Sequence, residues 1–215
     1  MSIVLTLIFE IIFILNLFLF WLVFLKRNEY PGLHSLYKSI FPYIWTISLV
    51  CTLIFNSNFL QFIFPINFSY LQDLWIWFLL LGIVLIVVGI KVISMVRKVF
   101  KVKGMSSDES ILITKGPYAL IRHPIYLAWI LIFTGWAFIL DSPLAIIFIP
   151  VLILLLWIHS IYEERYILLP EYGDRFLQYC KKVPYRIFST PYNYIIIIIG
   201  IVVGYLGLIN WLFSS

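Results

Sequence analysis

The sequence has 215 residues, of which 63% are hydrophobic and only 12% are charged, and this composition excludes an ordinary soluble globular domain. Apolar runs of about 20 residues, long enough to cross roughly 30 Å of hydrocarbon, recur along the whole chain. The composition therefore predicts an all-α, polytopic membrane helical bundle without a separate soluble domain.

Six membrane spans are predicted, within a range of five to seven. The first apolar run is interpreted as a retained signal-anchor helix, because no Lys or Arg precedes it and it is longer than a signal-peptide core. The stretch 56–68 is apolar but contains Asn58, Pro65 and Asn67, so a longer span, a re-entrant piece and an interfacial loop all remain open. The predicted spans cover residues 3–25, 39–56, 71–96, 125–140, 143–160 and 193–213.

The 15 Lys and Arg residues follow a one-sided pattern. They lie after spans one, three and five, with Lys91 near the end of span three, whereas the opposite loops at 57–70 and 141–142 have none. Basic residues in short loops stay on the cytoplasmic side, so the pattern predicts a multi-pass integral membrane protein with both termini outside. The net charge of +5 therefore reflects topology and gives no argument for a nucleic-acid partner.

Three regions follow from these spans. Residues 1–100 are predicted to hold three transmembrane helices, residues 101–192 a helical hairpin with two polar loops that would carry any catalytic site, and residues 193–215 a C-terminal transmembrane helix. Cys51 falls in a predicted span and Cys180 in a basic loop, so no disulfide is expected.

A hairpin of spans four and five brings the polar residues of two loops together. These spans are joined by a minimal turn at Asp141-Ser142-Pro143, so they run antiparallel. Counting outward from the turn, the pair Arg122-His123 and the pair Glu163-Glu164 fall within about one helical turn of the same level, roughly 3–5 Å along the axis. An Arg-His pair is therefore expected to face two carboxylates at the inner membrane surface.

Further along the second loop, Tyr172, Phe176 and Tyr179 have the i, i+4, i+7 spacing of a short amphipathic helix. Such a helix would lie in the membrane interface, either as an anchor or as a roof over a site. His34 and His159 lack metal-ligand spacing, and no metal is predicted.

Over residues 105–188 the sequence resembles the isoprenylcysteine carboxyl methyltransferase and phospholipid methyltransferase families of integral membrane enzymes. The resemblance rests on the order and spacing of short motifs: Gly-Pro-Tyr at 116–118, Arg-His-Pro-Ile-Tyr at 122–126, Glu-Glu at 163–164, Tyr-Gly at 172–173, then Tyr179 and Lys-Val-Pro at 182–184.

The resemblance implies that S-adenosylmethionine binds at the cytoplasmic face and that a lipophilic or prenylated acceptor enters from the bilayer. It implies cofactor binding by Gly116, Pro117, Tyr118, Arg122, His123, Pro124, Tyr126 and Glu164. The expected reaction is carboxylate O-methylation of an isoprenylcysteine type, or methylation of a related lipid.

Methyl transfer from a sulfonium is an in-line displacement, so the expected task of the protein is alignment in a site that excludes water. Arg122, Glu163 and Glu164 are the predicted catalytic residues. Arg122 would pair with the cofactor carboxylate, and either glutamate would take a proton from an amine acceptor. Tyr118 and Tyr126 would offer ring faces to the cation or the adenine.

One position departs from the family pattern. Members often carry an Arg, associated with the acceptor, three residues before the paired carboxylates, and this chain has Ser160 there, next to His159. The departure leaves the acceptor and its reacting atom open. Two other functions also remain open: a sterol-reductase-like enzyme that uses NADPH, and a non-enzymatic membrane scaffold in which the Arg-His and Glu-Glu groups form only a structural ion-pair cluster.

Overall fold

A computed structural model describes residues 2–27, 29–54, 75–103, 112–140 and 143–189 of the chain. The long helices are α1 (Ser2–Leu25), α2 (Pro31–Ile54), α5 (Trp75–Lys103), α6 (Pro124–Ile139) and α7 (Pro143–Glu163). Short elements follow: η1 (Gly116–Ala119), the π-helical turn η2 (Glu164–Leu168), α8 (Leu169–Tyr172) and α9 (Asp174–Lys182). The predicted all-α class is confirmed, and no strand occurs within these ranges.

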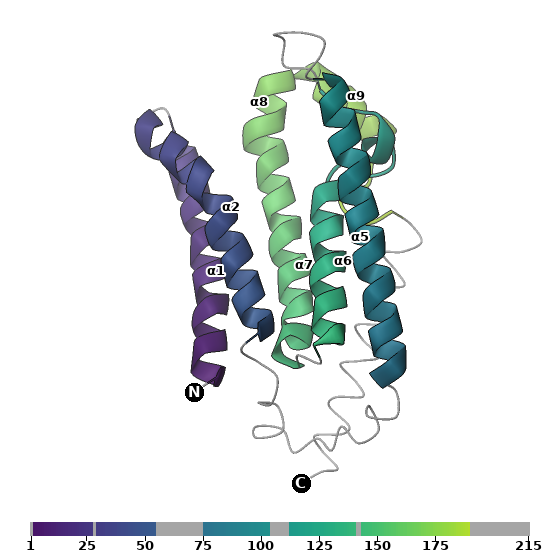
Figure 1. Ribbon diagram of the computed structural model, residues 1–215. Helices are drawn as coiled ribbons and strands as arrows, with labels where there is room; N and C mark the ends of the chain where they lie inside the picture. The colour runs from purple at the N-terminus through teal and green to yellow at the C-terminus, as the bar shows by residue number, and fades with distance from the viewer. Residues whose placement is uncertain (1, 28, 55–74, 104–111, 141–142, 190–215) are drawn as a thin grey trace, which may run out of the picture.

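The long helices run side by side, and the short elements gather at the end opposite the N-terminus of the chain (Figure 1). Among the described residues, three helices are long and apolar enough to cross a membrane, over Leu7–Leu25, Pro31–Leu53 and Leu79–Phe100, whereas Pro124–Ile139 is a shorter apolar helix. The predicted sixth span, 193–213, and the open stretch 56–68 lie outside the described residues.

Two predicted helix boundaries are wrong. The second helix begins at Pro31 rather than at residue 39, because a proline at the first helical position starts a helix without losing a hydrogen bond. The third continues to Lys103, past the predicted end at 96, because basic residues are good helix formers once the helix leaves the apolar layer.

Helices α5 and α6 approach each other closely at glycines. A Cβ atom on Gly135 would lie 2.6 Å from the carbonyl oxygen of Gly82 and 2.7 Å from a side-chain carbon of Ile86. The backbones therefore pack without room for a methyl group near the C-terminal end of α6, and this contact holds that end of the helix against α5.

Gly135→Ala is expected to destabilise the protein by about 1–3 kcal/mol, because the added methyl group meets backbone that has no room to move. The matched control is Gly32→Ala, where a Cβ would meet nothing within 4 Å. Thermal unfolding in detergent micelles should show a lower midpoint for the first variant only. Equal midpoints for the two variants would show that the α5–α6 contact tolerates expansion.

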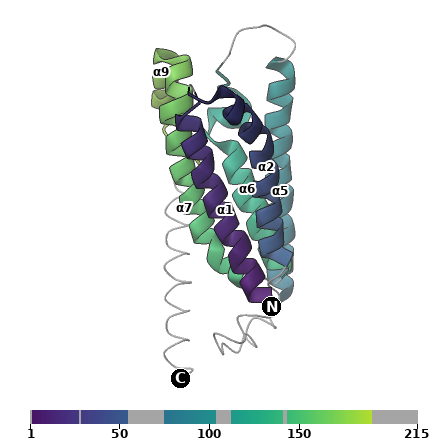
Figure 2. The same ribbon diagram turned by 90° about the vertical axis from the view of Figure 1, so that its left-hand side faces the viewer.

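Helix α1 is tied to the end of α7 by two hydrogen bonds. The indole Nε1 of Trp21 donates to Nδ1 of His159 at 2.8 Å, and the Tyr162 hydroxyl donates to the carbonyl of Trp21 at 2.9 Å. The Trp21 ring also stacks on His159 and Tyr162. Figures 1 and 2 together show α1 and α2 standing beside α6 and α7, so the N-terminal pair supports the end of α7 that carries the glutamates.

Candidate active site

The segment before α6 is shaped by one glycine and one proline. Gly116 opens η1 with a φ of +64°, and a Cβ there would lie 2.9 Å from Val99. Pro124 then occupies the first turn of α6, where its missing N–H costs nothing. Between them, the backbone N–H groups of Arg122 and His123 donate to the carbonyls of Tyr185 and Arg186 at 2.9 and 2.8 Å. A segment some sixty residues further on thus holds this polar stretch in place.

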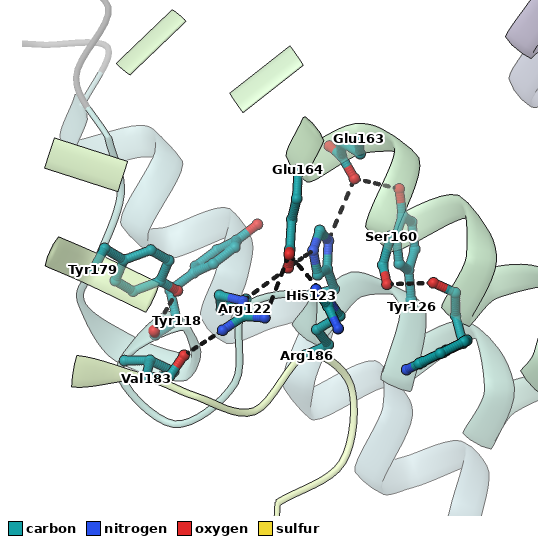
Figure 3. A network of polar contacts seen from close by, with 11 residues as sticks. Tyr118, Arg122, His123, Tyr126, Ser160, Glu163, Glu164, Tyr179, Val183 and Arg186 are labelled. Carbon is teal, nitrogen blue, oxygen red and sulfur yellow. Dashed lines mark hydrogen bonds and ion pairs between the residues drawn. The ribbon is translucent and has the colours of Figure 1, made fainter. Parts of the chain in front are cut away.

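Glu164 is the centre of a buried ion-pair cluster (Figure 3). Its Oε1 accepts from Nε of Arg122 at 2.8 Å and contacts Nε2 of His123 at 3.0 Å. Its Oε2 accepts from Nε of Arg186 at 3.0 Å and from Nη2 of Arg122 at 3.4 Å. The carboxylate therefore has four contacts with donor groups, which is about its full acceptor capacity. The predicted proximity of the Arg-His pair and the glutamates is confirmed.

Glu163 is held differently. Its Oε2 accepts from the Tyr126 hydroxyl at 2.6 Å and lies 3.3 Å from Nδ1 of His123. Within the described part of the chain its other carboxylate oxygen has no hydrogen bond, and 30% of the side chain is exposed, compared with 9% for Glu164. Glu163 thus keeps acceptor capacity that Glu164 has lost.

The charge states follow from these contacts. Burial by itself would raise the pKa of Glu164, but hydrogen bonds from His123 and Arg122 outweigh it and lower the pKa to about 2. Burial likewise opposes ionisation of Glu163, but the His123 and Tyr126 contacts leave its pKa below the usual value. For His123, burial would lower the pKa, and the two carboxylates outweigh burial and raise it. Only a protonated ring offers N–H donors to both carboxylates at once, so the cluster is ionic at neutral pH.

A cavity of about 200 Å³ opens beside this cluster. Its polar wall consists of Tyr118, Arg122, His123, Tyr126 and Glu163, and the rest is apolar or aromatic: Phe100, Leu112, Ile113, Ile125, Leu168, Tyr172 and Tyr179. Burial, and secondly the charge of Glu163, raises the pKa of Tyr118 to about 12, so this phenol stays neutral and can donate a hydrogen bond.

A second cavity of about 460 Å³ adjoins the first, because both are lined by Leu112 and Tyr179. It is lined by the basic side chains of Arg175 and Lys182, together with Thr114, Ala119, Gln178 and Val183. The two cavities together offer a cationic end, at Arg175 and Lys182, and an end with the partly exposed carboxylate of Glu163.

The predicted cofactor residues divide into three groups. Tyr118, Arg122, His123 and Tyr126 line the 200 Å³ cavity. Gly116, Pro117 and Pro124 line a different, largely apolar cavity of about 680 Å³ against α5. Glu164 lines none of the three cavities and lies behind Arg122 and His123. Cofactor binding by these residues therefore remains a prediction, and the geometry favours the first group.

The predicted amphipathic helix through Tyr172 and Tyr179 is interrupted. Gly173 has a φ of +52°, which side-chain-bearing residues rarely adopt, and it separates α8 from α9. Phe176 and Tyr179 are buried on α9, and Tyr172 packs against the same cluster from α8. The Tyr179 hydroxyl donates to the carbonyl of Tyr118 at 2.7 Å, and Tyr172 and Tyr179 both line the cavity.

His159 and Ser160 both lie next to the site without lining its cavity. His159 is buried against the rings of Trp21 and Tyr126, and the Ser160 hydroxyl donates to the carbonyl of Trp157 in its own helix at 2.6 Å. Whether either takes the place of the family's acceptor-side Arg stays a prediction.

Val183 and Pro184 were recognisable in the sequence only as part of a family motif, and residues 185–187 had no assigned role. Arg122 donates through Nη1 to the carbonyl of Val183 at 2.8 Å, and Arg186 binds Glu164. From the sequence, Arg186 counted only as one of several basic loop residues. Pro184, which favours an extended residue before it, was the available sign that the chain runs straight there.

Comparison with known proteins agrees with the resemblance. Residues 77–175 match the family described as phospholipid methyltransferase. A protein from Xenopus laevis, described as protein-S-isoprenylcysteine O-methyltransferase, is 32% identical over 83 residues, which are 39% of this chain and 29% of the relative's length. No solved structure matches the chain. The resemblance to these methyltransferase families is confirmed, and the family match includes the Arg-His-Pro and Glu-Glu motifs but ends before Arg186.

Proposed function

We propose that this chain, whose residues 77–175 match the phospholipid methyltransferase family, is an integral membrane methyltransferase that uses S-adenosylmethionine and methylates a lipophilic acceptor. The observation that carries the proposal is the cavity at one end of the apolar helices, where Glu163, His123, Tyr118 and Tyr126 converge. Convergent polar groups in an otherwise apolar pocket are typical of a small-molecule site.

The residues present fit the cofactor. S-adenosylmethionine carries a sulfonium, an amino group and a carboxylate, and when bound it supplies an activated methyl group. The partly exposed Glu163 suits its cationic groups, and the basic wall of the adjoining cavity, with Arg175 and Lys182, suits its carboxylate. The aromatic rings of Tyr118 and Tyr126 suit a cation or the adenine.

The geometry changes the role expected of Arg122. Arg122 is 8% exposed, and its guanidinium already binds Glu164 and the carbonyl of Val183. We therefore assign Arg122 to holding the site together, rather than to pairing with the cofactor carboxylate. Arg122 and Glu163 both line the cavity, and we assign the ligand contact to Glu163, because one of its carboxylate oxygens has no hydrogen bond among the described residues.

The acceptor we propose is a prenylated cysteine carboxylate or a related lipid, in line with the name of the Xenopus relative. A carboxylate acceptor is a nucleophile without losing a proton, so the chain's residues would only orient it and exclude water. With an amine acceptor, Glu163 would take the proton that the amine must lose first. We place the site on the cytoplasmic side with both termini outside, because the basic residues lie in loops at that end.

Equilibrium binding to the detergent-purified protein tests the cofactor, with S-adenosylmethionine and NADPH measured separately. S-adenosylmethionine is expected to bind in the range of about 1 µM to 1 mM that enzymes show for their substrates. Binding of NADPH alone would move the chain to the reductases, and binding of neither would favour a scaffold. Methyl transfer to a farnesylated cysteine, compared with phosphatidylethanolamine, then separates a carboxylate acceptor from an amine acceptor.

A further inference from the structure

Glu164 has little capacity left to bind a ligand. Each of its oxygens contacts two donor groups, and three of these four contacts are 2.8–3.0 Å long. The long one, at 3.4 Å, comes from Arg122 to the oxygen that Arg186 also binds. Arg186 therefore makes the shorter of the two bonds to Oε2, and without it that oxygen would keep only the 3.4 Å contact.

The chain after α9 is built to present Arg186 at this point. Ile187 is 1% exposed and belongs to the main hydrophobic core, which anchors the segment. The carbonyls of Tyr185 and Arg186 accept the backbone N–H groups of Arg122 and His123. With the core on one side and the backbone of the motif on the other, the Arg186 side chain is directed to Glu164, where it remains 33% exposed.

We infer that Arg186 is a positioning residue of the proposed cofactor site, acting on the ligand only through Glu164. This inference rests on the proposed function. Arg186 completes the set of donors to Glu164, so that the carboxylate holds Arg122 and His123 in one orientation. His123 in turn contacts Glu163 at 3.3 Å and so helps to orient it. Of the two glutamates, Glu163 is the one that lines the cavity.

The test compares Arg186→Gln, Arg186→Lys, Glu164→Gln and the double variant Glu164→Gln/Arg186→Gln. Arg165→Gln is the matched control, because Arg165 is exposed, is next to Glu164 in the sequence, and has its guanidinium over the ring of Tyr166. The affinity for S-adenosylmethionine and the thermal midpoint without ligand are measured for each protein.

Loss of one charge-assisted hydrogen bond predicts about a tenfold or greater loss of affinity in Arg186→Gln. Arg186→Lys should recover most of the affinity, because lysine keeps the positive charge and can donate a hydrogen bond to Glu164. The control Arg165→Gln should bind like the wild type. Since Arg186 acts through Glu164, the double variant should bind no more weakly than Glu164→Gln alone.

Two results would overturn the inference. One is a loss of S-adenosylmethionine affinity on Arg186→Gln that is as large in the Glu164→Gln background as in the wild type, which would mean that Arg186 does not act through Glu164. The other concerns the protein without ligand: additive shifts of the thermal midpoint in the two single variants and the double variant would show that the residues are not coupled. If the wild type binds no S-adenosylmethionine, the proposed function fails, and the ligand-free midpoints still decide whether Arg186 acts through Glu164.

Discussion

Glu164→Ala is expected to abolish measurable binding of S-adenosylmethionine and to lower stability by about 3–5 kcal/mol, or roughly 6–20 °C in the thermal midpoint. The reason is that the substitution leaves Arg122 buried at 8% exposure with its charge uncompensated, and removes the partner of His123 and Arg186. The large loss of stability comes from leaving buried positive charge without a counter-charge, rather than from the loss of one favourable contact.

Thermal unfolding in detergent and equilibrium binding both measure this effect. Glu29→Ala serves as the control, because the Glu29 side chain is 64% exposed and its pair with Lys26 is 3.8 Å long, so it should change stability by less than about 1 kcal/mol. Equal midpoints for the two alanine variants would mean that the buried cluster contributes nothing to the fold.

Glu163→Gln is expected to weaken S-adenosylmethionine binding by about 10- to 150-fold while changing stability far less than Glu164→Ala. Glutamine keeps the shape of the side chain and can still accept from Tyr126, which donates to Glu163 at 2.6 Å. It lacks the negative charge that we assign to the cationic groups of the cofactor.

The same pair of assays separates the two glutamates. A variant that unfolds near the wild-type temperature but binds poorly identifies a ligand contact, whereas a variant that loses both identifies a structural one. If Glu163→Gln binds normally and Glu164→Gln does not, the carboxylate that meets the ligand is Glu164 and our division of roles is wrong.

The proximity of the Arg-His pair and the two glutamates was predictable from the sequence. The minimal turn at 141–143 and the rise of a helix brought Arg122 and His123 to the level of Glu163 and Glu164, and the contacts among them confirm this. Such counting succeeds because α6 and α7 are regular, antiparallel and closely joined, so that position along the axis depends only on residue number.

The direction in which each glutamate side chain projects around the helix axis could not be predicted in this way. Glu163 ends α7 and Glu164 begins a π-helical turn, in which the N–H of Leu169 donates to the carbonyl of Glu164 five residues back. This wider turn changes the angle at which consecutive side chains project. The family resemblance assigned cofactor contact to Glu164, and sequence alone gave no reason to prefer Glu163.

The role of Arg186 was beyond sequence reasoning for a different reason. Its bond to Glu164 joins residues that no helical period relates, across a break at Gly173 and two short helices. The charge of Arg186 was visible, but the partner that the fold gives it was not. The predicted sixth span and the side of the membrane on which the site lies remain predictions.

The hydrogen bonds between Arg122 and the segment 183–187 also imply an order of events during synthesis. Val183, whose carbonyl accepts from Arg122, is made 61 residues later. At about 5–20 residues per second, the arginine waits roughly 3–12 seconds for this partner. Until Glu164 is made, 42 residues after Arg122, the unpaired charge can be tolerated in water or among lipid headgroups but not in hydrocarbon. If the ribosome stalled before residue 183, the helices already made would lack the segment 183–187, which binds Arg122 and His123 at their polar ends.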